Sequence, residues 1–203
     1  MPRATPRQPR GSAVPARRRL LDAAEELFYR DGIAGTGVDA VLTRAGVAIG
    51  SLYRNFAGKD GLTVAYLDDR QARWTACWDD AVATATTPEG RVLAVFDALE
   101  GWAAQEGASR GCADLAALVS LPPGHPAAVA ALRHKAELAA RLRALVEEAV
   151  PAGAVDATTD QVVLAYDGAL ARLAVGGPAP GPEDPLEAAR AVVRGSLRSA
   201  AAP

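Results

Sequence analysis

The segment GVAIGSLYRNFAGKDGL, residues 46–62, decides the fold. Gly46 follows an apolar helical stretch and can supply a left-handed turn residue, with Val47 filling the corner behind it. A helix is expected from about Ile49 to Phe56, with Leu52 and Phe56 on its inner face because they lie four residues apart. Two short helices joined by a glycine-containing turn form a helix-turn-helix unit.

The residues before this segment complete a three-helix unit. A first helix is expected from Arg17, with Gly32 as its C-cap, because apolar residues recur there at intervals of three and four: Leu20, Ala24, Leu27 and Phe28. A second helix is expected from about Val38 to Ala45. Thr36 and Asp39 have the spacing of a capping box at its start.

The outer side of the third helix carries groups that can bond DNA: Ile49, Gly50, Ser51, Tyr53, Arg54 and Asn55. Arg54 can present two donors to guanine, and Ile49 can touch a thymine methyl group. Tyr53 and Asn55 can donate to phosphates, which fix the register without reading sequence. Lys59 opens the next helix, where free backbone N–H groups already attract a phosphate. The alternative is a helical core on which these groups are merely solvated.

Charge is distributed unevenly along the chain. Residues 1–60 carry ten Lys or Arg and six Asp or Glu, whereas residues 61–203 carry twelve and eighteen. Residues 1–16 are rich in Pro and Arg and contain no acidic residue, so we expect a disordered basic arm. Such an arm can follow a phosphate backbone or serve only as a solubilising tail. The basic N-terminal part of the chain predicts binding to a polyanion, whereas the acidic remainder suggests another role.

The rest of the chain is also expected to be helical, because no strand-like alternation appears. Glycine- and proline-rich breaks separate expected helices over about 59–84, 88–105, 110–119, 126–150, 160–175 and 186–199. The fold class predicted is therefore all-α with about nine helices. It comprises an N-terminal helix-turn-helix DNA-binding domain over 17–60 and a larger helical domain over 61–203.

Composition excludes several classes of protein. Two cysteines, Cys77 and Cys112, are too few for a disulfide framework and suit a reducing, cytoplasmic environment. No apolar run approaches the ~20 residues that span a bilayer. No phosphate loop, metal-binding spacing or nucleophile motif is present, so we expect neither an enzyme nor a bound cofactor.

The helix-turn-helix segment resembles the signature of the tetracycline-repressor (TetR) family of transcriptional regulators. The resemblance covers about residues 17–64 and rests on Gly35-Thr36, Asp39, Ala45-Gly46-Val47, Leu52-Tyr53, Phe56 and Lys59. The chain departs from the family pattern in having Ala48 and Ile49 where a Ser cap and a Lys are common. It also has Asn55 in place of a frequent His, and Gly58 in place of a frequent Ser.

The resemblance implies a homodimeric repressor whose two recognition helices bind the half-sites of a palindrome. It implies phosphate contacts from Thr36, Tyr53 and Lys59, and base contacts from Ile49, Gly50, Ser51 and Arg54. It further implies that residues 61–203 form a ligand-binding and dimerisation domain, in which a small apolar or amphipathic ligand releases the protein from DNA. The alternative is an all-helical ligand-binding module whose reading head lacks sequence-specific DNA binding.

Candidates for a ligand pocket come from five of the expected helices: Trp74, Trp78, Phe96, Trp102, Cys112, Leu115, His134 and Tyr166. Aromatic walls with a few polar groups are typical of such sites, although aromatics at helical spacing also pack ordinary cores. Cys112 is either a pocket wall, a small buried hydrophobe or a sensing thiol. Its spacing to His125 and His134 matches no zinc pattern.

The last two expected helices offer a surface for dimerisation. Their apolar residues include Val162, Tyr166, Leu170, Leu173, Leu186, Val193 and Leu197. Two such helices from each subunit would form a four-helix interface.

Overall fold

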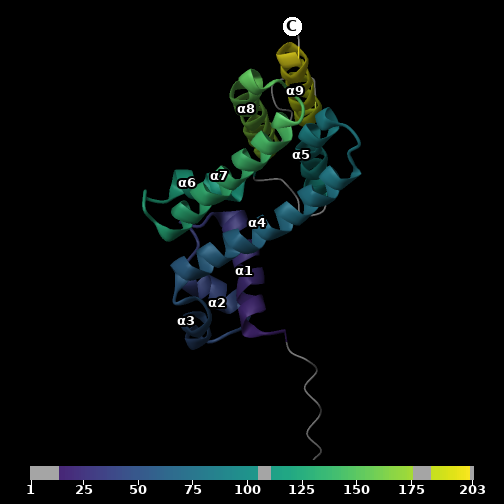
Figure 1. Ribbon diagram of the computed structural model, residues 1–203. Coiled ribbons are helices and arrows are strands. Elements are labelled where there is room, and N and C mark those ends of the chain that lie inside the picture. Colours follow the sequence, from purple (N-terminus) through teal and green to yellow (C-terminus); the bar gives the residue numbers. More distant parts are fainter. Residues whose placement is uncertain (1–13, 105–110, 176–183, 202–203) are drawn as a thin grey trace, which may run out of the picture.

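The computed structural model describes residues 14–104, 111–175 and 184–201. The regular structure of these residues is α-helical, apart from one short 3-10 turn and two π-helical residues at 103–104, with no strand among them (Figure 1). The helices are α1 (Ala16–Asp31), α2 (Val38–Ala45), α3 (Ile49–Phe56), α4 (Lys59–Thr84), α5 (Pro88–Trp102), α6 (Ala113–Ser120), α7 (Pro126–Glu147), α8 (Val155–Ala174) and α9 (Pro185–Ala201), with the turn η2 (Ala152–Ala154) before α8. The all-α prediction is confirmed. Residues 1–13 of the expected arm, Gln105 and Arg110 lie outside the described residues.

Helices α1, α2 and α3 form a small unit around one apolar core (Figure 1). Gly46 ends α2 in the left-handed conformation (φ 62°), as its position in the sequence predicts. The side chain of Arg19 on α1 fixes this turn, because its Nη1 donates to the carbonyl oxygens of Ala45 and Gly46 at 3.2 and 3.1 Å. The angle between α2 and α3 is therefore anchored to α1.

Helix α4 is shared by two apolar cores. Leu62, Tyr66 and Leu67 near its start pack with α1–α3 and with buried alanines at the start of α7. Trp74 and Trp78, further along, pack with α5, α7, α8 and α9. Figure 1 shows α4 running from the three-helix unit to the far bundle. The two parts are therefore connected by α4 and also by α7, whose Ala127 and Ala131 pack in the core of the three-helix unit.

Two local expectations differ from the structure. Helix α8 begins at Val155, five residues before the expected start at Asp160, because Val155 is buried and the hydroxyl of Thr159 donates to its carbonyl oxygen at 2.8 Å. Thr36 does not cap α2, whose N-cap is Gly37 with no side-chain bond. The Thr36 hydroxyl is buried instead and donates to the carbonyl oxygen of Gly32 at 2.7 Å, which ties the end of α1 to the start of α2.

Candidate nucleic-acid interface and ligand cavity

Helix α3 buries one face and leaves large side chains on the other. Leu52 and Phe56 are buried in the three-helix core. Ile49 and Tyr53 are 53% and 61% exposed, although both are large and partly apolar. Arg54 and Asn55 are exposed as well. A short helix that presents apolar and polar groups together in this way is suited to a partner with both methyl and polar edges, such as a DNA groove.

The guanidinium of Arg54 is held over the first turn of α3. Its Nη2 donates to the Ser51 hydroxyl at 3.2 Å. A Cβ added at Gly50 would stand 3.5 Å from the other terminal nitrogen of Arg54, so the guanidinium lies directly over Gly50. Three of the residues expected to face bases are thereby brought together at the N-terminal end of the helix, the end that contacts base edges in helix-turn-helix proteins.

The start of α4 lies beside Tyr53. Ala57 and Gly58 join the two helices with positive φ angles of 56° and 125°. A Cβ at Gly58 would meet the Tyr53 ring at 3.7 Å, which shows that the ring lies against this turn. Lys59 is the first residue of α4, so its ammonium group adds to the partial positive charge of the helix start. Tyr53 and Lys59 are thus neighbours at a place suited to one phosphate.

Two expected DNA contacts already have bonds within the protein. The Asn55 Nδ2 donates to the Ser51 carbonyl oxygen at 2.7 Å, on its own helix. Thr36 is buried, with its hydroxyl committed to backbone oxygens. The expectation that the Thr36 side chain binds phosphate is therefore corrected, because its hydroxyl is enclosed where α1 meets α2.

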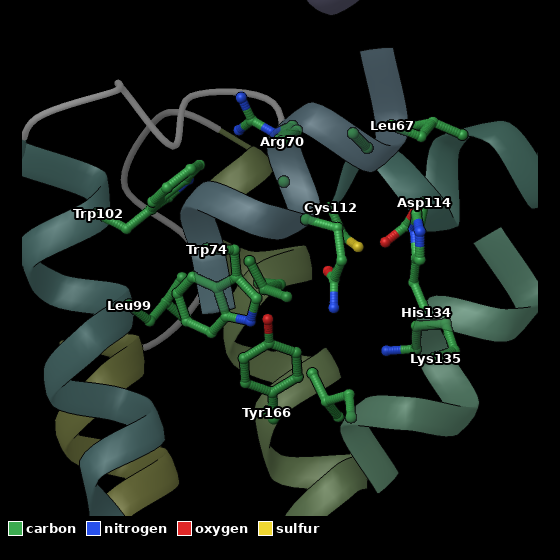
Figure 2. A pocket seen from close by; sticks show the side chains of 15 residues that line it. Leu67, Arg70, Trp74, Leu99, Trp102, Cys112, Asp114, His134, Lys135 and Tyr166 are labelled. Carbon is green, nitrogen blue, oxygen red and sulfur yellow. The ribbon is translucent and has the colours of Figure 1, made fainter. Parts of the chain in front are cut away.

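A cavity of about 60 Å³ lies in the larger part of the molecule, between α4, α5, α7 and α8 (Figure 2). Five of the eight expected pocket residues line it: Trp74, Trp102, Cys112, His134 and Tyr166. The other three do not and are corrected here. Trp78 lies against the guanidinium of Arg141, Phe96 is fully buried in the core, and Leu115 is partly exposed on α6.

Charged residues that sequence reasoning missed also line the cavity, namely Arg70, Asp114 and Lys135. Arg70 lies four residues before Trp74 and therefore on the same face of α4. The spacing of the apolar and aromatic residues on α4 thus places Arg70 on the face that lines the cavity. Lys135 pairs with Asp167 on α8. Each of these charges therefore faces the cavity with a carboxylate or an imidazole beside it.

His134 links three helices from the cavity wall. Its Nδ1 lies 3.0 Å from Asp114 on α6, and its Nε2 lies 3.0 Å from Asp68 on α4. Burial alone lowers the pKa of His134, but the hydrogen bonds and charges of Asp114 and Asp68 outweigh burial and raise it above its usual value. Because carboxylates only accept hydrogen bonds, this arrangement favours the charged imidazolium.

The environment of Cys112 disfavours the reactive thiolate form. Burial, followed by the negative charge of Asp114, raises the pKa of the Cys112 thiol above its usual value. A raised pKa lowers the thiolate fraction that reacts with oxidants. The cavity-wall interpretation of Cys112 is therefore favoured over the sensing-thiol interpretation. In the described part of the chain, no group of three or more His, Cys, Asp and Glu side chains is placed to hold a metal ion.

Arg70 connects the cavity to α1. Its Nη1 forms an ion pair with Oε1 of Glu25, and its guanidinium lies 4.5 Å from the centre of the Tyr29 ring. On the cavity side the same group lies 5.1 Å from the centre of the Trp102 ring. Arg73 donates to the second oxygen of Glu25 at 2.7 Å. A shift of Arg70 at the cavity wall would therefore alter its contacts with Glu25 and Tyr29 on α1.

Comparisons with known proteins identify the class of the chain. The profile of the family described as "Bacterial regulatory proteins, tetR family" matches residues 20–66. Two HTH-type transcriptional regulators of Pseudomonas putida, SrpR and TtgW, are each 30% identical over 93 residues. These residues are 46% of this chain, 44% of SrpR and 69% of TtgW, so the alignment spans less than half of SrpR.

Two solved structures are similar over nearly the whole chain. SCO4454, a TetR-family transcriptional regulator from Streptomyces coelicolor, is 31% identical with a TM-score of 0.80 and covers 92% of this chain and 96% of its own. The protein sav143 from Streptomyces avermitilis is 34% identical with a TM-score of 0.75 and covers 92% and 98%. The chain belongs to the TetR family. It is a transcriptional regulator with a helix-turn-helix DNA-binding unit, and not an enzyme.

In this TetR-family chain, six of the seven residues expected at a dimer surface are buried within the subunit itself. They are Val162, Tyr166, Leu170, Leu186, Val193 and Leu197, and only Leu173 is half-buried. The expectation is corrected for these six, because α8 and α9 use this face to pack on each other and on α5 and α7.

The outer face of the same two helices carries other apolar residues. Leu164 is 72% exposed, and Val175 and Val192 are also exposed. Gly168 and Ala171 lie between Leu164 and Val175 at intervals of four and three residues, so α8 presents a continuous outward stripe.

In the described residues of this TetR-family protein, no helix is both long and apolar enough to cross a membrane.

Proposed function

We propose that this TetR-family regulator is a homodimeric repressor that binds a palindromic operator and is released from it by a small molecule. The observation that carries the proposal is the outer face of α3. There, Ile49 and Tyr53 are exposed, and the Ser51 hydroxyl accepts a hydrogen bond that holds the Arg54 guanidinium over Gly50, near the N-terminal end of the helix. The proposal divides the chain into a basic arm over 1–16, a DNA-binding domain over 17–60 and a larger ligand-binding and dimerisation domain over 61–203. It also places the protein in the cytoplasm.

The side chains divide into two roles under this proposal. Arg54, Ser51, Gly50 and Ile49 face base edges in the major groove, where Arg54 selects guanine and Ile49 contacts a thymine methyl. Tyr53 and Lys59 bind phosphate at the start of α4 and fix the register of the helix. Asn55 adds a polar contact from the remaining oxygen and hydrogen atoms of its amide.

The dimer forms, in this proposal, through the outward stripe of α8 together with Val192 on α9. Exposed apolar side chains separated by Gly168 and Ala171 allow two helices to approach closely. A twofold axis through this surface would give the pair of reading heads that a palindrome requires.

Release follows from the contacts of Arg70. A ligand that displaces Trp102 or Arg70 weakens the ion pair with Glu25 and the contact with Tyr29, both of which hold α1 to α4. The three-helix unit then loses its fixed orientation on α4. Two DNA-binding domains whose separation no longer matches that of the half-sites bind DNA less tightly.

Selection of binding sites from a random DNA pool with the full chain tests this proposal. A palindromic consensus with two half-sites would support a dimeric, sequence-reading regulator. Recovery of DNA without any enriched sequence would contradict it and favour a ligand-binding module with a non-specific head, an alternative to which the missing side-chain cap at Ala48 lends some support.

A further inference from the structure

The walls of the cavity are dominated by three aromatic rings. Trp74 lies edge-to-face with Trp102, with ring centres 5.9 Å apart, and tilted against Tyr166 at the same distance. Leu67, Leu99 and Leu138 complete the apolar part of the wall. Figure 2 shows the three rings around one side of the cavity, opposite the helix that carries His134. Such walls favour a flat aromatic molecule.

The charged groups on the wall are neutralised from within the protein. Arg70 pairs with Glu25, Lys135 pairs with Asp167, and His134 lies between Asp68 and Asp114. A charged ligand would have to break one of these pairs or be buried without a counter-charge of its own. Both are costly, because an uncompensated charge in a low-dielectric site is strongly disfavoured. The wall therefore selects for an uncharged molecule.

One buried donor on the wall lacks a partner. Trp74 is 7% exposed, and its Nε1 has no hydrogen-bond partner among the described residues. Figure 2 shows this nitrogen on the side of the indole ring that faces the cavity. Buried polar groups in native proteins are nearly always bonded, so an orphan donor on a cavity wall points to a ligand that accepts a hydrogen bond.

The small size of the space favours the smallest aromatic ligand, a single ring. About 60 Å³ is less than the roughly 150 Å³ of an apolar cavity that holds benzene, so even one ring enters only when a wall side chain shifts. Trp102 is the large side chain on the wall that also contacts Arg70. A shift of Trp102 would therefore reach the ion pair between Arg70 and Glu25.

We propose that this cavity binds an uncharged, single-ring aromatic compound with one hydrogen-bond acceptor, which Nε1 of Trp74 bonds. The proposal rests on the proposed function, since it treats the cavity as the effector site. It adds the chemical class of the effector and the residue that selects it.

Isothermal titration of the full chain with three probes of similar shape tests this class. Acetophenone is neutral and accepts a hydrogen bond, benzoate adds a charge, and ethylbenzene lacks an acceptor. We expect acetophenone to bind about threefold to tenfold more tightly than ethylbenzene, the value of one hydrogen bond. Benzoate should bind at least tenfold more weakly than acetophenone. Benzoate binding as tightly as acetophenone, or no acetophenone binding at millimolar concentration, would overturn the proposal.

Two tryptophan variants locate the hydrogen bond. Trp74→Phe should remove the preference for acetophenone over ethylbenzene, while Trp78→Phe should keep it. Trp78 is a matched control, because its Nε1 is also buried without a partner among the described residues but it does not line the cavity. An unchanged preference in Trp74→Phe would refute the assignment. If that variant fails to fold, the ranking of the three probes on the unaltered protein decides the ligand class.

The failure of this inference can be told apart from failure of the proposed function. Acetophenone that binds in the calorimeter but leaves DNA bound in a separate anisotropy assay would support the ligand class and contradict release. A charged or aliphatic compound that releases DNA, with no acetophenone binding, would support release and overturn the ligand class.

Discussion

Replacing Glu25 by Gln should destabilise the protein far more than the same change at the neighbouring Glu26. Glu25 pairs with Arg70, whose side chain is only 9% exposed, and also with Arg73, whereas Glu26 pairs with exposed Arg44 on the surface of the three-helix unit. The two variants differ by one position and remove the same charge. They therefore separate the effect of the buried pair from that of a glutamate on α1 in general.

The expected size of the loss follows from the environment of the pair. Two charges about 4 Å apart at an effective dielectric constant near 20 attract by about 4 kcal/mol. Gln keeps an acceptor oxygen, and the Glu25 side chain is 24% exposed, so about half of this should be lost. We expect Glu25→Gln to lower the free energy of unfolding by about 2 kcal/mol, or roughly 4–8 °C in Tm for a chain of this size. Glu26→Gln should show no measurable loss, because exposed ion pairs contribute little.

Urea denaturation of the two variants and the unaltered protein, followed by circular dichroism at constant protein concentration, measures the difference. Equal unfolding free energies for the two variants would refute the reasoning, because the contact of Arg70 with Glu25 would then hold nothing together. The proposed route from cavity to DNA would lose its physical basis with it.

Three further predictions concern the reading head, the histidine and the dimer. Arg54→Ala should relax the preference for one base pair in selected DNA, whereas Lys59→Ala should weaken binding to all sequences and reduce the slope of log affinity against log salt by about one. Because its neighbours raise the folded-state pKa of His134, the stabilisation is complete below the unfolded value near 6.5 and is lost as pH rises through the folded value. The unfolding free energy of the unaltered protein should therefore exceed that of His134→Gln by more at pH 6 than at pH 9 in urea titrations, and an equal gap would contradict the assignment. Leu164→Asp should shift the mass measured by light scattering at micromolar concentration from dimer to monomer, while the exposed Asp160→Asn on the same helix should not.

The sequence predicted best where single residues fix the backbone. The bounds of α2, α3 and α4 agree with expectation, because Gly46 ends one helix in a left-handed turn and Gly58 precedes the next. The start of α8 differs from the expectation because Thr158 and Thr159, which follow a Pro- and Gly-containing break, belong to the helix. Their burial against the core outweighs the weak helix propensity of threonine.

The side chains that were misassigned share a physical cause. Apolar spacing on α8 and α9 identified a buried face, but spacing cannot tell the subunit's own core from a surface covered by a second subunit. For that reason the spacing predicts Val162 and Val193 at the interface, although both lie in the core. Arg70 was missed because arginine is usually exposed, and its burial depends on Glu25, which lies 45 residues earlier in the chain.

Fluorescence anisotropy of the full chain with the DNA upstream of its own gene, and with a scrambled duplex of equal length, tests the central claim most directly when run across a salt series. The account predicts tighter binding to the upstream DNA and a difference in affinity that persists as salt rises, because base contacts by α3 do not depend on counterion release. Equal affinity for both duplexes, lost steeply with salt, would show that the protein binds only phosphates on this DNA and would contradict the claim that it reads sequence there.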